Sequence, residues 1–259
     1  ASDVYKRQVM VNILLSFLFL LVGKLSSAQS YKIRHCYNGC PQGTSEENHL
    51  IIRSIYALSY NTLTKSADWV SYKVSADSIG IASSLSRAAV RDGYVKATLT
   101  EEDFAKSEDI GLVRSQYASL VDFAGTPFWN EVNYLTNNIA RTSSLSQGAW
   151  YGLDWSIRNL VNRQGEVYVL TGPIFDSNAE AMLLPITTPH RVPDRFFKVV
   201  VNKVGQSAAF ILEQSAAVHV HHCEMIASIE EIENLTELNL FPLQTPILEE
   251  SVYSAFGCY

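Results

Sequence analysis

Alternation of apolar and polar positions predicts two strands in the first third of the chain. Residues 51–61 and 67–75 are rich in β-branched and aromatic side chains, which suit the pleated, half-buried surface of a sheet. We expect a turn between them, near Asn61–Lys65. Residues 76–112 have only weak periodicity and are expected to be irregular.

The clearest helical pattern starts at residue 149 and stops at Gly165, a residue typical of helix ends. The apolar positions on one helix face are Ala149, Trp150, Leu153, Ile157, Leu160 and Val161. Three apolar segments, 166–175, 196–202 and 207–214, predict further strands, and residues 228–238 predict a short amphipathic helix. We therefore expect an α+β domain whose central, largely antiparallel sheet is flanked by helices.

An apolar run near the N-terminus predicts an export signal. Residues 11–22 are too few to cross a bilayer comfortably, and small residues at Ser26 and Ala28 stand where a signal peptidase prefers them. We expect cleavage after Ala28. The alternative is a retained membrane anchor, which Lys24 disfavours because it interrupts the run.

The expected mature chain is a single domain over residues 29–259, secreted or periplasmic and without membrane attachment. Residues 1–9 precede Met10, the expected initiator, and resemble translated adapter sequence. Removing residues 1–28 takes away three basic residues and one acidic residue, so the mature net charge is −8. Because no basic stripe is visible either, the composition disfavours a protein held to nucleic acid mainly by phosphate neutralisation.

The four cysteines predict two disulfides, since an exported chain meets an oxidising compartment. Three pairings are possible. Cys36 and Cys40 flank an Asn-Gly turn that can bring them together, which leaves Cys223 with Cys258. The second bridge would then tie down the C-terminus.

A zinc site is the alternative for Cys223, because it follows three histidines in the run "HVHHC". His219 and His221 alternate as on a strand, and no Cys-x-x-Cys pair accompanies them. We therefore expect His219, His221 and His222 to be strand residues beside a disulfide.

Several ordered segments carry a resemblance to a known family. The central run is "WNEVNYLTNNIARTSSLSQGAWYGLDWSIRNLV", followed by "VYVLTGPIF"; "CYNGCPQGTS" precedes it, and "FFKVVV", "AAFILEQ" and "HCEMIASIEEIENLTEL" follow. Together they resemble the DNA/RNA non-specific endonucleases of the Serratia nuclease type, over essentially the whole mature chain. The resemblance implies a ββα-metal (His-Me finger) fold, cleavage of DNA and RNA, and one hydrated Mg²⁺.

The family signature Asp-Arg-Gly-His falls on residues 113–116, which here read Val-Arg-Ser-Gln, and we expect this segment to be the remains of a catalytic loop. The resemblance therefore places the general base at Gln116 and keeps the phosphate-contacting Arg114. It places the metal-binding asparagine at Ser146 and a glutamate that holds metal-bound water at Asp154. Arg158 is retained four residues further on, and Arg87 is a looser match to another phosphate-contacting arginine.

These replacements bear directly on the chemistry. A carboxamide cannot take up a proton near neutral pH, so Gln116 can at best position water. The hydroxyl of Ser146 is shorter than the amide it replaces, and Asp154 is one methylene shorter than glutamate, so we expect at most a weak Mg²⁺ site. Asp154 and Arg158 have a second interpretation, as an exposed ion pair on one helix face.

Three functions are compatible with these residues. The favoured hypothesis is a pseudonuclease, impaired or inactive in hydrolysis and retained for binding DNA, RNA or a protein partner, which includes a second copy of the chain. The second is an active Mg²⁺-dependent endonuclease with a rearranged site. The third is a non-enzymatic surface or assembly protein, which the net charge of −8 supports. Mg²⁺ is expected as a cofactor only if activity remains.

Overall fold

The computed structural model describes residues 32–176, 182–186 and 190–258. One compact unit spans Ile33–Tyr259. The predicted export signal lies outside the described residues. Within them, no helix is both long enough and apolar enough to cross a bilayer.

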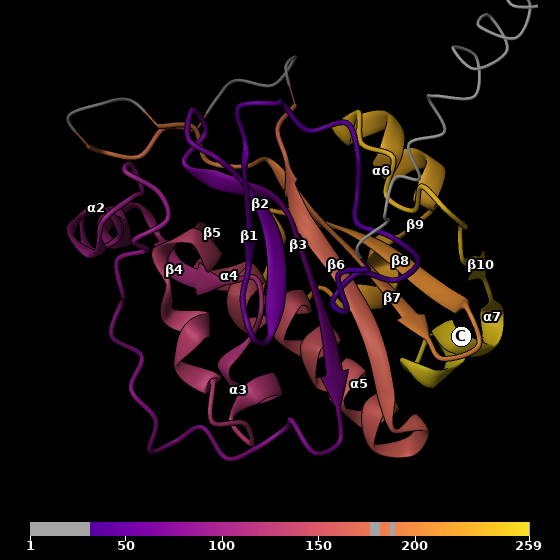
Figure 1. Cartoon of the computed structure of the whole chain (residues 1–259). Coiled ribbons are helices and arrows are strands. Elements are labelled where there is room, and N and C mark those ends of the chain that lie inside the picture. The colour runs from indigo at the N-terminus through magenta and orange to yellow at the C-terminus, as the bar shows by residue number, and fades with distance from the viewer. Residues whose placement is uncertain (1–31, 177–181, 187–189, 259) are drawn as a thin grey trace, which may run out of the picture. The chain divides into compact units, whose positions relative to one another are not determined.

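The core of this unit is an eight-stranded sheet with the strand order β1-β2-β3-β6-β7-β8-β10, and β9 pairs with β8. Its neighbouring strands are antiparallel, apart from the parallel pair β8 and β10 (Figure 1). The strands are β1 (His49–Ile52), β2 (Tyr56–Asn61), β3 (Ser66–Ser75), β6 (Glu166–Ile174), β7 (Arg195–Asn202), β8 (Gln206–Glu213), β9 (Ile226–Ala227) and β10 (Ile247–Leu248). The expected α+β class is confirmed.

Helices cover both faces of this sheet because successive strand side chains point to opposite sides. On β7, Phe196 and Val200 join the core beneath α5 (Ala149–Gln164), whereas Phe197, Val199 and Val201 join the core beneath α6 (Ile229–Thr236). The remaining helices are α2 (Glu101–Ser107), α3 (Leu120–Phe123), α4 (Ser143–Gln147) and α7 (Glu250–Ala255), with 3₁₀ turns at Glu108–Ile110, Trp129–Asn133, Leu135–Asn137 and His222–Met225.

A separate two-stranded sheet leads into α4 and α5. Its strands are β4 (Leu112–Gln116) and β5 (Asn138–Thr142), paired antiparallel. Gly148 joins α4 to α5, and a Cβ there would lie 2.5 Å from the carbonyl oxygen of Val218. Only glycine allows this approach, so the residue lets the junction between α4 and α5 pack directly against the backbone at Val218.

Four local predictions were wrong. Residues 51–61 form two paired strands, β1 and β2, rather than one. The segment 76–112 contains α2, which begins with a capping box at Thr100. Residues 113–116 belong to strand β4 rather than to a loop. The histidines at 219–222 lie in turns and in the 3₁₀ helix His222–Met225, not on a strand.

Both predicted disulfides are confirmed: Cys36 pairs with Cys40, and Cys223 pairs with Cys258. The second bridge closes 35 residues and anchors the end of the chain beside α7. Because the Sγ atom of Cys223 is used in this bond, the adjacent residues His221 and His222 do not form a Cys/His zinc site with it.

Candidate functional site

Most of the residues that the resemblance selected line one cleft of about 230 Å³ between β4, β5 and the start of α5. Its lining is Arg87, Arg114, Ser115, Gln116, Ser119, Arg141, Ser146, Trp150 and Asp154. Of the predicted site residues, only Arg158 is not part of this lining. The ββα arrangement thus brings together residues that are up to 67 positions apart, from Arg87 to Asp154.

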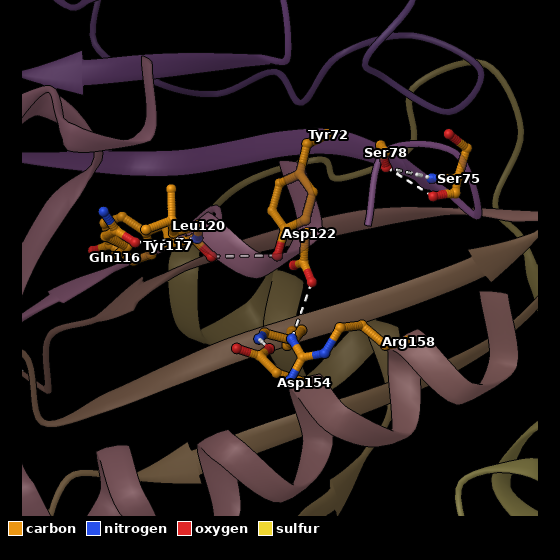
Figure 2. Close-up of polar contacts among 10 residues, drawn as sticks. Tyr72, Ser75, Ser78, Gln116, Tyr117, Leu120, Asp122, Asp154 and Arg158 are labelled. Carbon is orange, nitrogen blue, oxygen red and sulfur yellow. Dashed lines mark hydrogen bonds and ion pairs between the residues drawn. The ribbon is translucent and has the colours of Figure 1, made fainter. Parts of the chain in front are cut away.

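The Gln116 side chain is bonded to protein groups at both ends of its carboxamide. Its Nε2 donates to the carbonyl oxygen of Val132 at 3.2 Å and to Oδ1 of Asn133 at 3.0 Å. Its Oε1 accepts the backbone N–H of Leu120 at 3.2 Å, and Figure 2 shows the two residues side by side. The amide therefore orders the turn after β4, and it has no group that titrates near neutral pH.

At the expected metal-ligand position, the Ser146 hydroxyl interacts with a second serine. Its Oγ lies 3.0 Å from Oγ of Ser115, the residue at the glycine position of the signature. A pair of mutually bonded, neutral hydroxyls replaces a longer amide carbonyl. Such a pair is a weaker ligand for a hard cation than a carbonyl or carboxylate oxygen.

Two acidic residues, Asp154 in the cleft lining and Asp122 outside it, form two separate buried ion pairs. Asp154 accepts a charge-assisted hydrogen bond from Lys198 of β7, whose side chain is fully buried. Arg158 instead pairs with Asp122 of α3, at 3.0 Å (Figure 2). The expected exposed pair between Asp154 and Arg158 is therefore wrong, because each residue faces the core and has a different partner.

Burial changes the proton affinity of these groups. Desolvation raises the pKa of Asp122 to about 6, reinforced by the nearby charge of Asp154 and opposed by Arg158. Desolvation also lowers the pKa of Lys198, although Asp154 opposes that shift. Since an Asp122 with a pKa near 6 is ionised at neutral pH, the Asp122–Arg158 pair is charged there.

Arg141, in the cleft lining, is a second buried cation near Asp154, in addition to Lys198. Only 2% of its surface is exposed, and its guanidinium lies 3.3 Å from the ring centroid of Trp150. Lys198 Nζ lies 3.8 Å from the same centroid. Trp150 therefore contacts two cations, each stabilised by the negative face of the ring.

Arg114 and Arg87 bring further positive charge to the cleft. Arg114 donates from Nη1 to Oδ1 of Asn138 at 3.0 Å and from Nη2 to the backbone carbonyl of Arg87. Partial burial lowers the pKa of Arg114, which still leaves it protonated at neutral pH. These bonds hold Arg114 at the cleft while Arg87 itself is exposed.

This donor set does not fit a resident divalent cation. The cleft offers one carboxylate, Asp154, and that carboxylate already faces Lys198 with Arg141 nearby. Mg²⁺ needs hard oxygen ligands, usually with at least one carboxylate free to bind it. A further divalent charge beside two buried cations would be repelled.

No histidine lines this cleft. His190 is buried elsewhere, where desolvation and Lys65 lower its pKa to about 4. His222 contacts the carbonyl oxygen of Phe256 at 3.2 Å, beside α7. Neither histidine is therefore placed to act as a base in the described cleft.

Sequence reasoning missed Arg141, Lys198 and Asp122. For Lys198 a signal existed: in "RFFKVVV" it shares strand parity with Phe196 and Val200, so it had to face the same core as they do. Arg141 and Asp122 sit in short segments without clear periodicity, and nothing in their local sequence indicated burial.

Comparison with known proteins places this geometry in a family. The DNA/RNA non-specific endonuclease model matches residues 33–245. A nuclease from Serratia marcescens is 32% identical over 238 residues, covering 88% of each chain, and a nuclease from Nostoc is 24% identical, covering 85% of each.

The fold itself also has a solved counterpart. A chain in the crystal structure of the EndoG/EndoGI complex matches with a TM-score of 0.69 at 18% identity, covering 82% of this chain and 91% of that one. This likeness confirms the expected fold, a largely antiparallel sheet flanked by helices. The protein belongs to the DNA/RNA non-specific endonuclease family.

Proposed function

We propose that this family member binds the phosphate backbone of nucleic acid without hydrolysing it efficiently. The observation that carries the proposal is the bonding of Gln116, whose carboxamide uses both ends on protein groups at the position of the expected base. Loss of general-base catalysis alone costs about 10²–10⁴-fold in rate. The pairing of Asp154 with Lys198 supports the same conclusion for the metal.

Retained binding is supported by the charges of the cleft. Arg87, Arg114 and Arg141 line it together with a single carboxylate, so it is locally cationic although the mature chain is acidic. Guanidinium groups bind phosphate oxygens in a planar, two-point geometry. The positive charge of the cleft therefore bears more directly on phosphate binding than the negative net charge of the whole chain.

The direct test is an assay with plasmid DNA and RNA in Mg²⁺ or Mn²⁺, combined with a gel-shift titration at low and high salt. We expect no appreciable cleavage, together with binding that weakens as salt rises because phosphate contacts release counterions. Brisk cutting that chelation stops and Gln116→Ala abolishes would instead establish an active nuclease with a rearranged site. Salt-independent absence of binding would favour the non-enzymatic assembly protein.

A rebuilding experiment separates lost chemistry from lost geometry. Val113→Asp, Gln116→His and Ser146→Asn together restore the family's aspartate, histidine and metal-binding asparagine, while Ser115 still occupies the glycine position of the signature. We expect this triple variant to remain inactive because Arg141 still occupies the cleft wall, and we expect cleavage only when Arg141→Gln is added. Full activity of the triple variant would contradict this view of Arg141.

Export is part of the proposal and is supported by the two disulfides, which persist in oxidising compartments. We propose a secreted or periplasmic chain that begins after Ala28. Mass spectrometry of the protein recovered outside the cytoplasm tests this. Recovery of a chain that keeps residues 10–28 would contradict it.

A further inference from the structure

We propose that the cleft binds a phosphate group without a divalent cation. Arg141 supplies the positive charge in the cleft wall, and Arg114 provides a second guanidinium contact to the phosphate. This inference rests on the proposed function, because it names the ligand chemistry of that same site. It differs from the family's expected chemistry, in which a hydrated Mg²⁺ stands between protein and phosphate.

The hydrogen-bonding capacity of Arg141 is largely unused. A guanidinium carries five N–H donors. One bond is formed by Nη2, to the carbonyl oxygen of Gln116 at 3.2 Å, and the buried Nε has no partner. A buried polar group without a partner is costly, so a ligand that accepts from this side chain would be favoured.

The buried charges at the cleft also do not cancel. Among the described residues, Asp154 is the only carboxylate in the lining, and it is bonded to Lys198. Asp122 also acts on Lys198 but is paired with Arg158, so the Arg141 charge remains in excess. Across the β4–β5 ladder, the residue opposite Arg141 is Val113, at the acidic position of the family signature. An aspartate there would have faced Arg141; valine provides no negative charge.

Arg141 nevertheless stays charged. Burial lowers the pKa of Arg141 to about 10, with Asp154 opposing the shift, so the group is protonated at neutral pH. Stacking on Trp150 at 3.3 Å holds the guanidinium in one place before any ligand arrives. A site prepared in this way loses little conformational entropy on binding.

The size and the polar lining of the cleft favour a small ligand. Its volume of about 230 Å³ is below the range of about 300–1,000 Å³ that is typical of pockets for whole drug-sized ligands. The lining is polar, and its one aromatic residue, Trp150, is already covered by Arg141. The cleft therefore suits a small oxyanion better than a nucleobase.

The test is binding in EDTA. One probe is inorganic phosphate, whose binding is detected as thermal stabilisation of the protein. The other two are fluorescent oligonucleotides with and without a 5′-phosphate, whose binding is detected by fluorescence anisotropy. We expect all three to bind without metal, and Mg²⁺ to add nothing. Tighter binding of the 5′-phosphorylated probe would assign the site to a terminal phosphate, whereas equal binding would assign it to internal phosphodiesters.

The variants are Arg141→Met and Arg114→Met, with Arg163→Met as the control. Arg163 is exposed near the end of α5 and lies outside the cleft. We expect each cleft variant to weaken metal-free binding by about tenfold or more, the usual effect of losing a charged hydrogen-bond donor, and the control to bind as the parent does. Arg114 is only half-buried, so its variant keeps the test decisive if Arg141→Met fails to fold.

The outcomes separate this inference from the proposed function. Oligonucleotide binding that requires Mg²⁺, or that neither arginine variant weakens, overturns metal-free capture in this cleft and leaves a non-cleaving nucleic-acid-binding protein. Rapid cleavage in Mg²⁺ overturns the proposed function instead.

Discussion

Two buried charge clusters lie one turn apart on α5 and differ in one respect. In the Asp122–Arg158 pair, one carboxylate meets one guanidinium at 3.0 Å (Figure 2). In the cluster formed by Asp154, Lys198 and Arg141, one carboxylate faces two cations. The first is balanced within the protein, and the second carries an excess positive charge.

The difference separates a charge pair that is neutral within the fold from a cluster whose excess positive charge is the basis of the proposed phosphate binding. The Asp122–Arg158 pair lies outside the cleft lining, and because its two charges neutralise each other it leaves no net charge to attract a ligand. An unbalanced cluster that reaches the cleft wall through Arg141 gains stability when an anion arrives. The same helix therefore carries a structural pair and a receptive cluster, because its successive turns meet different strands and helices.

The largest effect is expected from breaking the balanced pair. Arg158→Met should lower the free energy of unfolding by about 3 to 5 kcal/mol, because it leaves the buried Asp122 carboxylate without its partner. Urea unfolding measures this change. The double variant Asp122→Asn with Arg158→Met should recover much of the loss, and equal losses in the single and double variants would contradict a coupled pair.

A smaller effect is expected from removing one cation of the unbalanced cluster. Lys198→Met should cost about 1 to 3 kcal/mol of unfolding free energy, since Arg141 remains near Asp154 to offset its charge. The same change should weaken metal-free phosphate binding, because Asp154 then neutralises Arg141. A loss as large as that of Arg158→Met, with phosphate binding unchanged, would show that the clusters do not differ as described.

The third effect is a pH dependence carried by Asp122. Its pKa is about 6 in the folded protein and near 3.8 when unfolded, so between these values the folded state binds the extra proton. Its contribution to stability is therefore fully present below about pH 4 and is lost as pH rises to about 6. We expect a change of about 2 to 3 kcal/mol between pH 4 and pH 7, because each pKa unit corresponds to about 1.4 kcal/mol.

Comparison with Asp122→Asn over pH 4 to 7 isolates this contribution, because the amide does not titrate. The difference in unfolding free energy between the parent and the variant should fall as pH rises through this window. A difference that stays constant, or that rises with pH, would show that Asp122 does not have a raised pKa in the folded state.

The regular parts of the fold were predictable because their periodicity is strong. The helix face from Ala149 to Val161 and the strands around 166–175, 196–202 and 207–214 are close to the elements found. Short elements were less accessible: β4 and β5 have five residues each, and too few positions to show a period. Their pairing is fixed by contacts between segments more than twenty residues apart.

The candidate site shows the same division. The family resemblance placed Arg114, Gln116, Ser146 and Asp154 together, and the structure brings all four into one cleft. The resemblance did not indicate which side chains form hydrogen bonds or ion pairs with these four residues. That Gln116 is bonded at both ends, and that Asp154 faces Lys198 rather than Arg158, depends on which side chains the fold packs against each other.

The sequence by itself determined the helix, the main strands, the cysteine pairs and the absence of a titratable side chain at position 116, because these follow from local pattern and residue chemistry. Only the tertiary structure decided the balance of charge in the cleft. That balance depends on Val113 lying opposite Arg141 and on Lys198 reaching Asp154 from another strand. Electrostatic energy depends on distance in space and on burial, and neither is written in the order of residues along the chain.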